Sequence, residues 1–129
     1  MIKKRFGIAV SSEVADELDM ITEKFNTDRS KVVEYALRSF LMEYKHHYSK
    51  CHKCVGILVI SRKSLGVEIS NNDIYSEFKE VILSYSHHHV ENRCIEVLVL
   101  SGSSEIIADL HNRLLRAGCE CRYIPLHSE

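Results

Sequence analysis

The sequence predicts an α+β protein with two small units, a strand-helix-helix unit over residues 1–45 and a β-α-β-β-α-β unit over residues 55–129. Three observations predict this class. An alternating strand pattern opens the chain, two amphipathic helical stretches follow it, and continuous apolar runs with a further helical stretch occupy the second half. Residues 46–54 are polar and fit no buried period, so they are interpreted as a linker.

The first unit begins with a half-buried strand over residues 4–10. Its apolar side chains are Phe6, Ile8 and Val10, and they alternate with Arg5, Gly7 and Ala9. One face of this strand is expected to enter a core while the other face stays free.

Two helices follow the strand. Ser11 and Ser12 can cap the first helix, which ends at the turn over residues 26–28. The second helix begins near Ser30 and carries a wide apolar stripe that needs a large partner surface. About 45 residues lie near the limit for independent folding, so we expect an intertwined homodimer whose two strands pair as a ribbon. The apolar helix positions are Val14, Leu18, Ile21, Phe25, Val32, Val33, Ala36, Leu37, Phe40 and Leu41.

In the second unit, continuous apolar runs over residues 55–60 and 95–100 predict central strands. Between them we expect a short helix ending near Phe78 and a strand over residues 81–90, which turns back at residues 91–93.

The second unit closes with a helix and a short strand. Ser103 or Ser104 can cap the helix, Gly118 suits a left-handed residue after its end, and the strand over residues 119–124 stops at Pro125. The elements together predict an α+β sandwich with one exposed sheet face.

Composition excludes several classes of function. The 129 residues carry a formal net charge of −1, so no global basic field is available and any DNA contact must be local. The sequence contains neither an apolar run of roughly 18 residues nor a signal-peptide core, so we expect a cytoplasmic protein without membrane contact. No nucleophile–base arrangement, phosphate-binding glycine loop or carboxylate pair is recognisable, so we expect no enzyme.

Cysteine and histidine are the residue types best suited to bind a metal or to react. The five cysteines are an odd set, and in the cytoplasm they are expected to serve thiol or metal chemistry rather than disulfides. Eight histidines add imidazole ligands. On a strand His87 and His89 point together while His88 points away, and Cys94 across the turn can join either set.

Three segments together resemble a known family. The first is the strand over residues 5–10 with the following helix and the tripeptide at residues 28–30, which is similar to an Asn-Arg-Ser signature. The second is His88, five residues and the run from Cys94 to Gly102, and the third is the helix and strand that follow. In this order they resemble the nickel-responsive ribbon-helix-helix transcription regulators, the NikR family.

The resemblance implies an N-terminal ribbon-helix-helix dimer that binds double-stranded DNA. It also implies a C-terminal ferredoxin-like (ACT-type) domain that forms homotetramers and binds nickel at their interface. Ni2+ is therefore the expected cofactor, with Zn2+ or Cu also compatible with imidazole and thiolate ligands.

A two-stranded antiparallel ribbon fits the major groove, so the outward side chains of the first strand are expected to face base edges of an operator. Arg5 is the candidate specific reader. Members of the resembling family usually carry hydroxyl side chains where Gly7 and Ala9 stand, so base specificity is expected to be lower or to shift toward Arg5, backbone groups and DNA shape. Basic residues can neutralise phosphates, and the helix that begins near Ser30 offers amide groups to one. The predicted DNA contacts are Lys3, Lys4, Arg5, Gly7, Ala9, Arg29 and Ser30.

The candidate metal ligands are His87, His88, His89 and Cys94. The resembling proteins carry His-x-His, five residues and Cys, with a fourth His thirteen residues before the second His and donated across the subunit interface. Aligned on the cysteine without a gap, this chain keeps the second His but has Ser86 at the first and Tyr75 at the remote position.

If the turn is one residue shorter, a different set of residues takes the ligand positions. His87 and His89 then take the His-x-His positions, and the remote position falls on Ser76. The fourth His is absent in both alignments, so affinity, metal identity or geometry is expected to differ from the family pattern.

A second group of potential ligands occupies the linker. It consists of His46, His47, Cys51, His52 and Cys54. Its Cys-x-x-Cys pair can chelate zinc, and the alternative is a hydrophilic linker that happens to contain ligands. Cys119 and Cys121 are predicted to be buried core residues, and His111 to be structural or solvated.

The leading functional hypothesis is a metal-responsive DNA-binding regulator in which paired ribbon-helix-helix dimers bind the operator. The alternative is a regulator of the same architecture that senses a different metal, a small molecule or redox state. A small enzyme or metal-trafficking protein is a third, weaker hypothesis.

Overall fold

The computed structural model describes residues 2–63 and 71–126 and divides the chain into two compact units, Met1–Phe40 and Leu41–Glu129. The predicted domains also contain residues 1, 64–70 and 127–129, which lie outside the described residues. In the described part, no helix combines the length and the apolar character that crossing a membrane requires.

The first unit contains two helices that agree with the sequence pattern. Helix α1 spans Ser12–Lys24, and the Ser11 hydroxyl accepts a hydrogen bond from the Val14 amide at 3.3 Å, as expected of an N-cap. Helix α2 spans Arg29–Glu43, and the Asp28 carboxylate accepts from the Lys31 amide at 2.9 Å. Both predicted helices are therefore confirmed.

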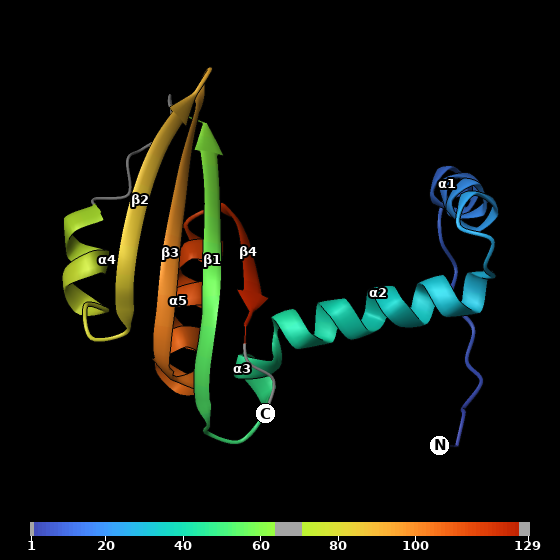
Figure 1. Cartoon of the computed structure of the whole chain (residues 1–129), viewed down its shortest axis with the longest axis horizontal. Helices are drawn as coiled ribbons and strands as arrows, with labels where there is room; N and C mark the ends of the chain where they lie inside the picture. Colours follow the sequence, from blue (N-terminus) through green and yellow to red (C-terminus); the bar gives the residue numbers. More distant parts are fainter. Residues whose placement is uncertain (1, 64–70, 127–129) are drawn as a thin grey trace. The chain divides into compact units, whose positions relative to one another are not determined.

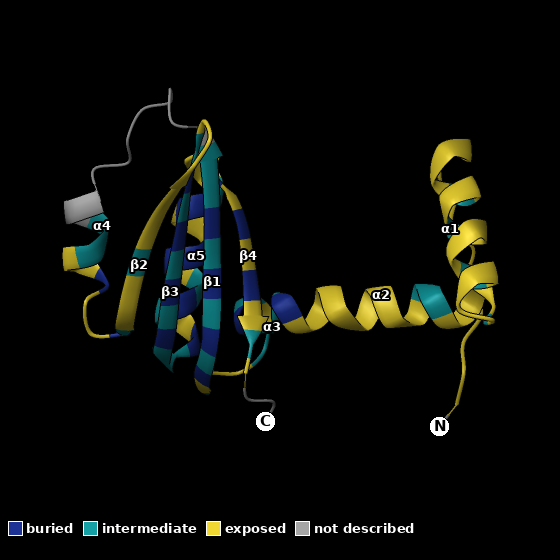
Figure 2. Ribbon diagram, turned by 45° about the horizontal axis from the view of Figure 1, so that its top comes forward, coloured by how far each residue is buried: buried dark blue, intermediate teal, exposed yellow. Residues whose placement is uncertain are grey.

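The strand expected over residues 4–10 is not formed in the single chain, where residues 2–11 belong to no helix or strand. A lone strand leaves its backbone N–H and C=O groups unpaired, so it needs a neighbouring strand. Phe6 is 72% exposed, α1 has no buried residue, and Glu43 is the buried residue of α2 (Figure 2). The described apolar residues of this unit therefore form no core within one chain.

The second unit has the β-α-β-β-α-β order that the sequence predicts. The elements are β1 (Lys53–Lys63), α4 (Asn71–Glu77), β2 (Ile82–Val90), β3 (Arg93–Ser103), α5 (Ser104–Arg116) and β4 (Glu120–Pro125). All strand pairs are antiparallel, and the sheet order is β2-β3-β1-β4 (Figure 1), the ferredoxin-like arrangement.

The core lies between one face of this sheet and its helices. Along β3 buried residues alternate with half-buried ones, so Leu98 and Leu100 face the helices and Val97 and Val99 face the other side. Helix α5 is capped by Ser103 as predicted. The core cluster consists of Cys54, Leu58, Ile60, Phe78, Val81, Leu98, Leu100, Ile107, Leu110, Leu114, Cys119, Cys121 and Tyr123, which confirms Cys119 and Cys121 as buried.

The segment interpreted as a polar linker is instead folded. Helix α3 occupies Lys45–Tyr48, strand β1 already begins at Lys53, and His46 is only 4% exposed. The polar composition of residues 46–54 concealed this packing, because neutral imidazoles can be buried against one another and against tyrosine rings.

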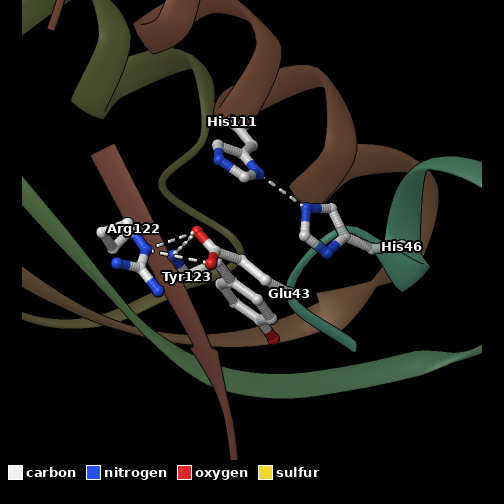
Figure 3. A network of polar contacts seen from close by, with 5 residues as sticks. All are labelled: Glu43, His46, His111, Arg122 and Tyr123. Carbon is white, nitrogen blue, oxygen red and sulfur yellow. Dashed lines mark hydrogen bonds and ion pairs between the residues drawn. The ribbon is translucent and has the colours of Figure 1, made fainter. Parts of the chain in front are cut away.

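Glu43 attaches the end of α2 to the sheet. Its carboxylate accepts hydrogen bonds from Arg122 Nε at 2.9 and 3.0 Å and from the Tyr123 amide at 3.2 Å (Figure 3). Strand β4 is an edge strand, so its outward amides need partners outside the sheet. One carboxylate thereby holds the segment before α3 against β4.

Candidate functional site

The β2–β3 hairpin positions the first group of candidate ligands. Val90 pairs with Arg93, so the turn consists of Glu91 and Asn92, and Glu91 has a φ of 54°. This is the shorter of the two turns considered above. Its register places His89 opposite Cys94 and therefore puts both on the same face of the sheet.

His87, His89 and Cys94 converge at the end of this hairpin. Their ligand atoms all lie within 4.8 Å of one another, and Cys94 Sγ is 3.5 Å from His89 Nδ1. The two imidazoles are exposed, whereas the thiol is buried. His88 pairs with Ile95 and belongs to the opposite face, so the structure brings together three of the four predicted ligands.

This donor set fits the metals that the sequence predicts. Two imidazoles and one thiolate suit Ni2+, Zn2+ or Cu, and a three-residue cluster leaves further coordination positions open. We call His87, His89 and Cys94 the hairpin triad.

Tyr75, one candidate for the remote ligand position, takes part in a buried polar network instead. Its hydroxyl donates to Glu96, which is 1% exposed and forms an ion pair with Arg62 at 2.6 Å. Burial, and then the hydrogen bond to Glu96, raises the pKa of Tyr75 far above its ordinary value, so the phenol stays protonated. Ser76, the other candidate, is exposed.

A second group of histidines lies between α3 and α5. His111 Nδ1 is 2.8 Å from His46 Nε2 and 3.1 Å from His47 Nε2 (Figure 3 shows the His46–His111 contact). His111 is fully buried and Tyr44 stacks on its ring, with 5.1 Å between centroids. We call His46, His47 and His111 the helix triad.

The electrostatics of the helix triad favour neutral rings. Burial, followed by the nearby charge of His47, lowers the pKa of His46 to about 3 and that of His111 to about 4. Burial also lowers the pKa of His47. At neutral pH each ring therefore keeps a lone pair on one nitrogen.

The structure divides the ligand group that was predicted in the linker. His46 and His47 join His111, whereas Cys54 Sγ lies 3.2 Å from His52 Nε2 and Cys51 Sγ lies 3.6 Å from Ser103 Oγ. Neither triad found among the described residues includes the Cys-x-x-Cys pair.

Sequence reasoning missed the role of His111, although a signal was present. His111 follows Ile107 by four residues and precedes Leu114 by three, so it stands on the apolar face of α5. A histidine in a buried stripe needs a polar partner, and its partners here lie 64 and 65 residues away in the chain.

The predicted DNA contacts lie in the first unit. Lys3, Lys4, Arg5, Gly7, Ala9, Arg29 and Ser30 are all exposed. Arg29 donates two hydrogen bonds to the Asp19 carboxylate, at 2.7 and 2.8 Å. The Lys31 amide, in the first turn of α2, donates to the Asp28 carboxylate. These contacts compete with the predicted phosphate-binding roles of Arg29 and the α2 amino terminus.

The fold and these side chains define a class of protein: a ferredoxin-like domain with clustered histidine and cysteine side chains, preceded by a helical unit whose described residues form no core of their own. Residues 57–117 match the family described as the NikR C-terminal nickel-binding domain. The chain is 32% identical over 116 residues to a curated protein of Saccharolobus islandicus that is provisionally named a nickel-responsive regulator, covering 88% of this chain and 85% of the relative.

A relative from Dictyoglomus thermophilum with the same provisional name is 29% identical over 114 residues, covering 85% of this chain and 84% of the relative. An uncharacterized protein of Thermotoga maritima of known structure shares 28% identity at a TM-score of 0.54, with 59% of this chain and all of that chain covered. The protein belongs to the nickel-responsive regulator family.

Proposed function

We propose that the protein is a metal-responsive transcription regulator that binds double-stranded DNA through its first unit and a divalent metal through the hairpin triad. The observation that carries this proposal is the convergence of His87, His89 and Cys94 within 4.8 Å on one face of the β2–β3 hairpin. Ni2+ is the favoured metal, and Zn2+ or Cu suits the same donors.

The lack of a core in the first unit supports a homodimer. Phe6, Phe25 and Phe40 are 72, 66 and 59% exposed in the single chain, and burying such rings needs a second copy. In that homodimer residues 4–10 of two chains pair into a ribbon, and Arg5, Gly7 and Ala9 face base edges in the major groove.

The metal domain is proposed to form a homotetramer, as the resemblance implies, and the hairpin triad then lies at the contact between subunits. Because Tyr75 is bound to Glu96, the fourth coordination position is left to a residue of another subunit or to water. Metal binding and operator binding are coupled through this assembly, so each ligand raises the affinity for the other by the same factor.

The position of Tyr75 also favours the second candidate function, a regulator of the same architecture that senses another metal, a small molecule or redox state. In this version the hairpin triad binds nickel too weakly to change operator affinity. Cys94, which is buried beside His89, would be the redox-active group.

The test is binding of the full chain to its own upstream DNA at fixed salt, with chelator, with Ni2+ and with Zn2+. Salt is held fixed because phosphate contacts make DNA affinity strongly salt-dependent. We expect Ni2+ to tighten binding at least tenfold in the wild type and in His88→Ala, and not in His89→Ala. His88 is the matched control because it stands on the same strand and faces away.

Equal, sequence-specific DNA binding with and without every metal would reject metal sensing and favour the second candidate. Absence of sequence-specific DNA binding under all conditions would reject the proposal as a whole.

A further inference from the structure

In the helix triad, two close contacts between ring nitrogens cannot both be good hydrogen bonds. A neutral imidazole nitrogen either donates one proton or accepts through one in-plane lone pair. His111 Nδ1 nevertheless faces two ring nitrogens, at 2.8 Å on His46 and 3.1 Å on His47. One proton can serve only one of these contacts well, so the other brings two nitrogens together without a good hydrogen bond.

The spacing of these nitrogens matches that of ligands around a metal ion. With metal–nitrogen bonds of about 2.0–2.1 Å, an octahedral shell separates neighbouring ligands by about 3.0 Å and a tetrahedral shell by about 3.4 Å. The observed separations of 2.8 and 3.1 Å reach this range with shifts of a few tenths of an ångström. The third side chain, His47, is the more exposed one and leaves the cluster accessible.

The protonation of the rings is also compatible with ligation. His46 Nδ1 and His111 Nε2, which do not face the triad, are buried and have no hydrogen-bond partner among the described residues. No other contact therefore opposes placing the ring protons on these nitrogens, which directs the lone pairs of His46 Nε2 and His111 Nδ1 into the cluster. The nearby Glu43 carboxylate is already bound to Arg122 and Tyr123.

We propose that His46, His47 and His111 form a second metal site, which takes a divalent ion such as Zn2+ or Ni2+ through nitrogen ligands from the protein. It is separate from the hairpin triad, because its ligands come from α3 and α5 and include no thiol. The matched family segment, residues 57–117, contains His111 but neither histidine of α3.

The consequence of this site is a metal cross-link between α3 and α5. Helix α3 follows the end of α2 and belongs, like α5, to the second unit. An ion bound at both helices stabilises the packing of α3 on α5 by mass action, since the unfolded chain holds no preformed cluster.

The experiment uses the full chain with Co2+ as a spectroscopic probe and Zn2+ as competitor. Co2+ at the hairpin triad is expected to show a thiolate charge-transfer band in the near ultraviolet, and Co2+ at the helix triad to show ligand-field bands without it. His89→Ala removes a ligand from the hairpin triad, and in this background we expect one equivalent of nitrogen-bound Co2+ to remain.

Adding His47→Ala to that background is expected to weaken the remaining site at least tenfold and to remove the Zn2+-dependent rise in Tm. His47 is chosen because it is the more exposed ligand, so its removal leaves the core intact. His111→Asn is the second variant, used with circular dichroism to verify folding, and His88→Ala is the control that should change neither site.

Two results would overturn the proposal. One is that His89→Ala binds no nitrogen-bound equivalent, and the other is that this equivalent is unaffected by both His47→Ala and His111→Asn. Either result leaves the proposed function intact, because DNA binding and its response through the hairpin triad are measured separately.

Discussion

The hairpin triad and the helix triad use the same kind of side chain in opposite settings. His87 and His89 are exposed on a strand next to the turn, and their partner Cys94 is five residues from His89. His46 and His111 are buried and 65 residues apart in the chain. Local hairpin geometry therefore leaves the two imidazoles of one triad at the surface, whereas packing between distant segments makes the other triad part of the core.

The largest expected difference is in stability. His111→Ala should lower the free energy of unfolding by about 3 kcal/mol, because it leaves a cavity in the core and removes the partner of two rings. Urea unfolding with chelator present measures this cost. A change below about 0.5 kcal/mol would mean that the helix triad is not part of the core.

The next expected difference is the pH dependence of stability, which should come from the helix triad and not from the hairpin triad. The folded pKa values of His46 and His111 are lowered to about 3 and 4, so below the unfolded value of about 6.5 the unfolded state binds protons that the folded state excludes. Stability therefore falls as the pH falls from about 6.5, by about 2 kcal/mol for each of the two rings at pH 5.

Urea unfolding at pH 7 and pH 5, with chelator, checks this sign. His87→Ala should keep the full pH dependence, whereas His111→Asn should reduce it. Equal stability of the wild type at the two pH values would contradict the burial of neutral imidazoles in the helix triad.

A smaller effect on stability tests whether Tyr75 belongs to the Glu96 network rather than to the metal site. Tyr75→Phe should cost about 1 kcal/mol of stability, because Glu96 loses a hydrogen bond while its ion pair with Arg62 remains. Metal affinity of the hairpin triad should stay within twofold of the wild type, as measured by competition with a chelating dye. A tenfold loss of affinity would show that the Tyr75 hydroxyl is a ligand after all.

The smallest expected change in stability belongs to the hairpin triad. His87→Ala removes an exposed side chain, so the free energy of unfolding should change by less than about 0.5 kcal/mol while metal affinity falls at least tenfold. Thermal unfolding and metal titration of the same sample separate the two effects. Destabilisation similar to that of His111→Ala would remove the distinction between the triads.

Much of the fold could be predicted because its signals are local. The continuous apolar runs of β1 and β3, the Ser11 and Ser103 caps and the hairpin between β2 and β3 all involve residues near one another in the chain. The shorter turn was one of two predicted alternatives, and the backbone pairing of Val90 with Arg93 selects it. The first strand was also predicted from a local pattern, but a strand needs a hydrogen-bonded neighbour, and the described residues of the single chain supply none to residues 4–10.

The linker and the helix triad could not be predicted in the same way. The segment around His46 looked polar because sequence reasoning counts side chains one at a time, whereas burial depends on the side chains that surround them. His111 carried a visible signal on the apolar face of α5, but its partners come from a helix 65 residues earlier.

The sequence alone therefore predicts the order of elements in the second unit, the two helices of the first unit and the four candidate ligands that include the hairpin triad, since backbone periodicity and turn length act over a few residues. Only the tertiary structure decided that α3 packs on α5, that Glu43 binds the edge of β4 and that Tyr75 binds Glu96. These contacts join distant segments, and their free energy comes from excluding water around groups that no local pattern brings together.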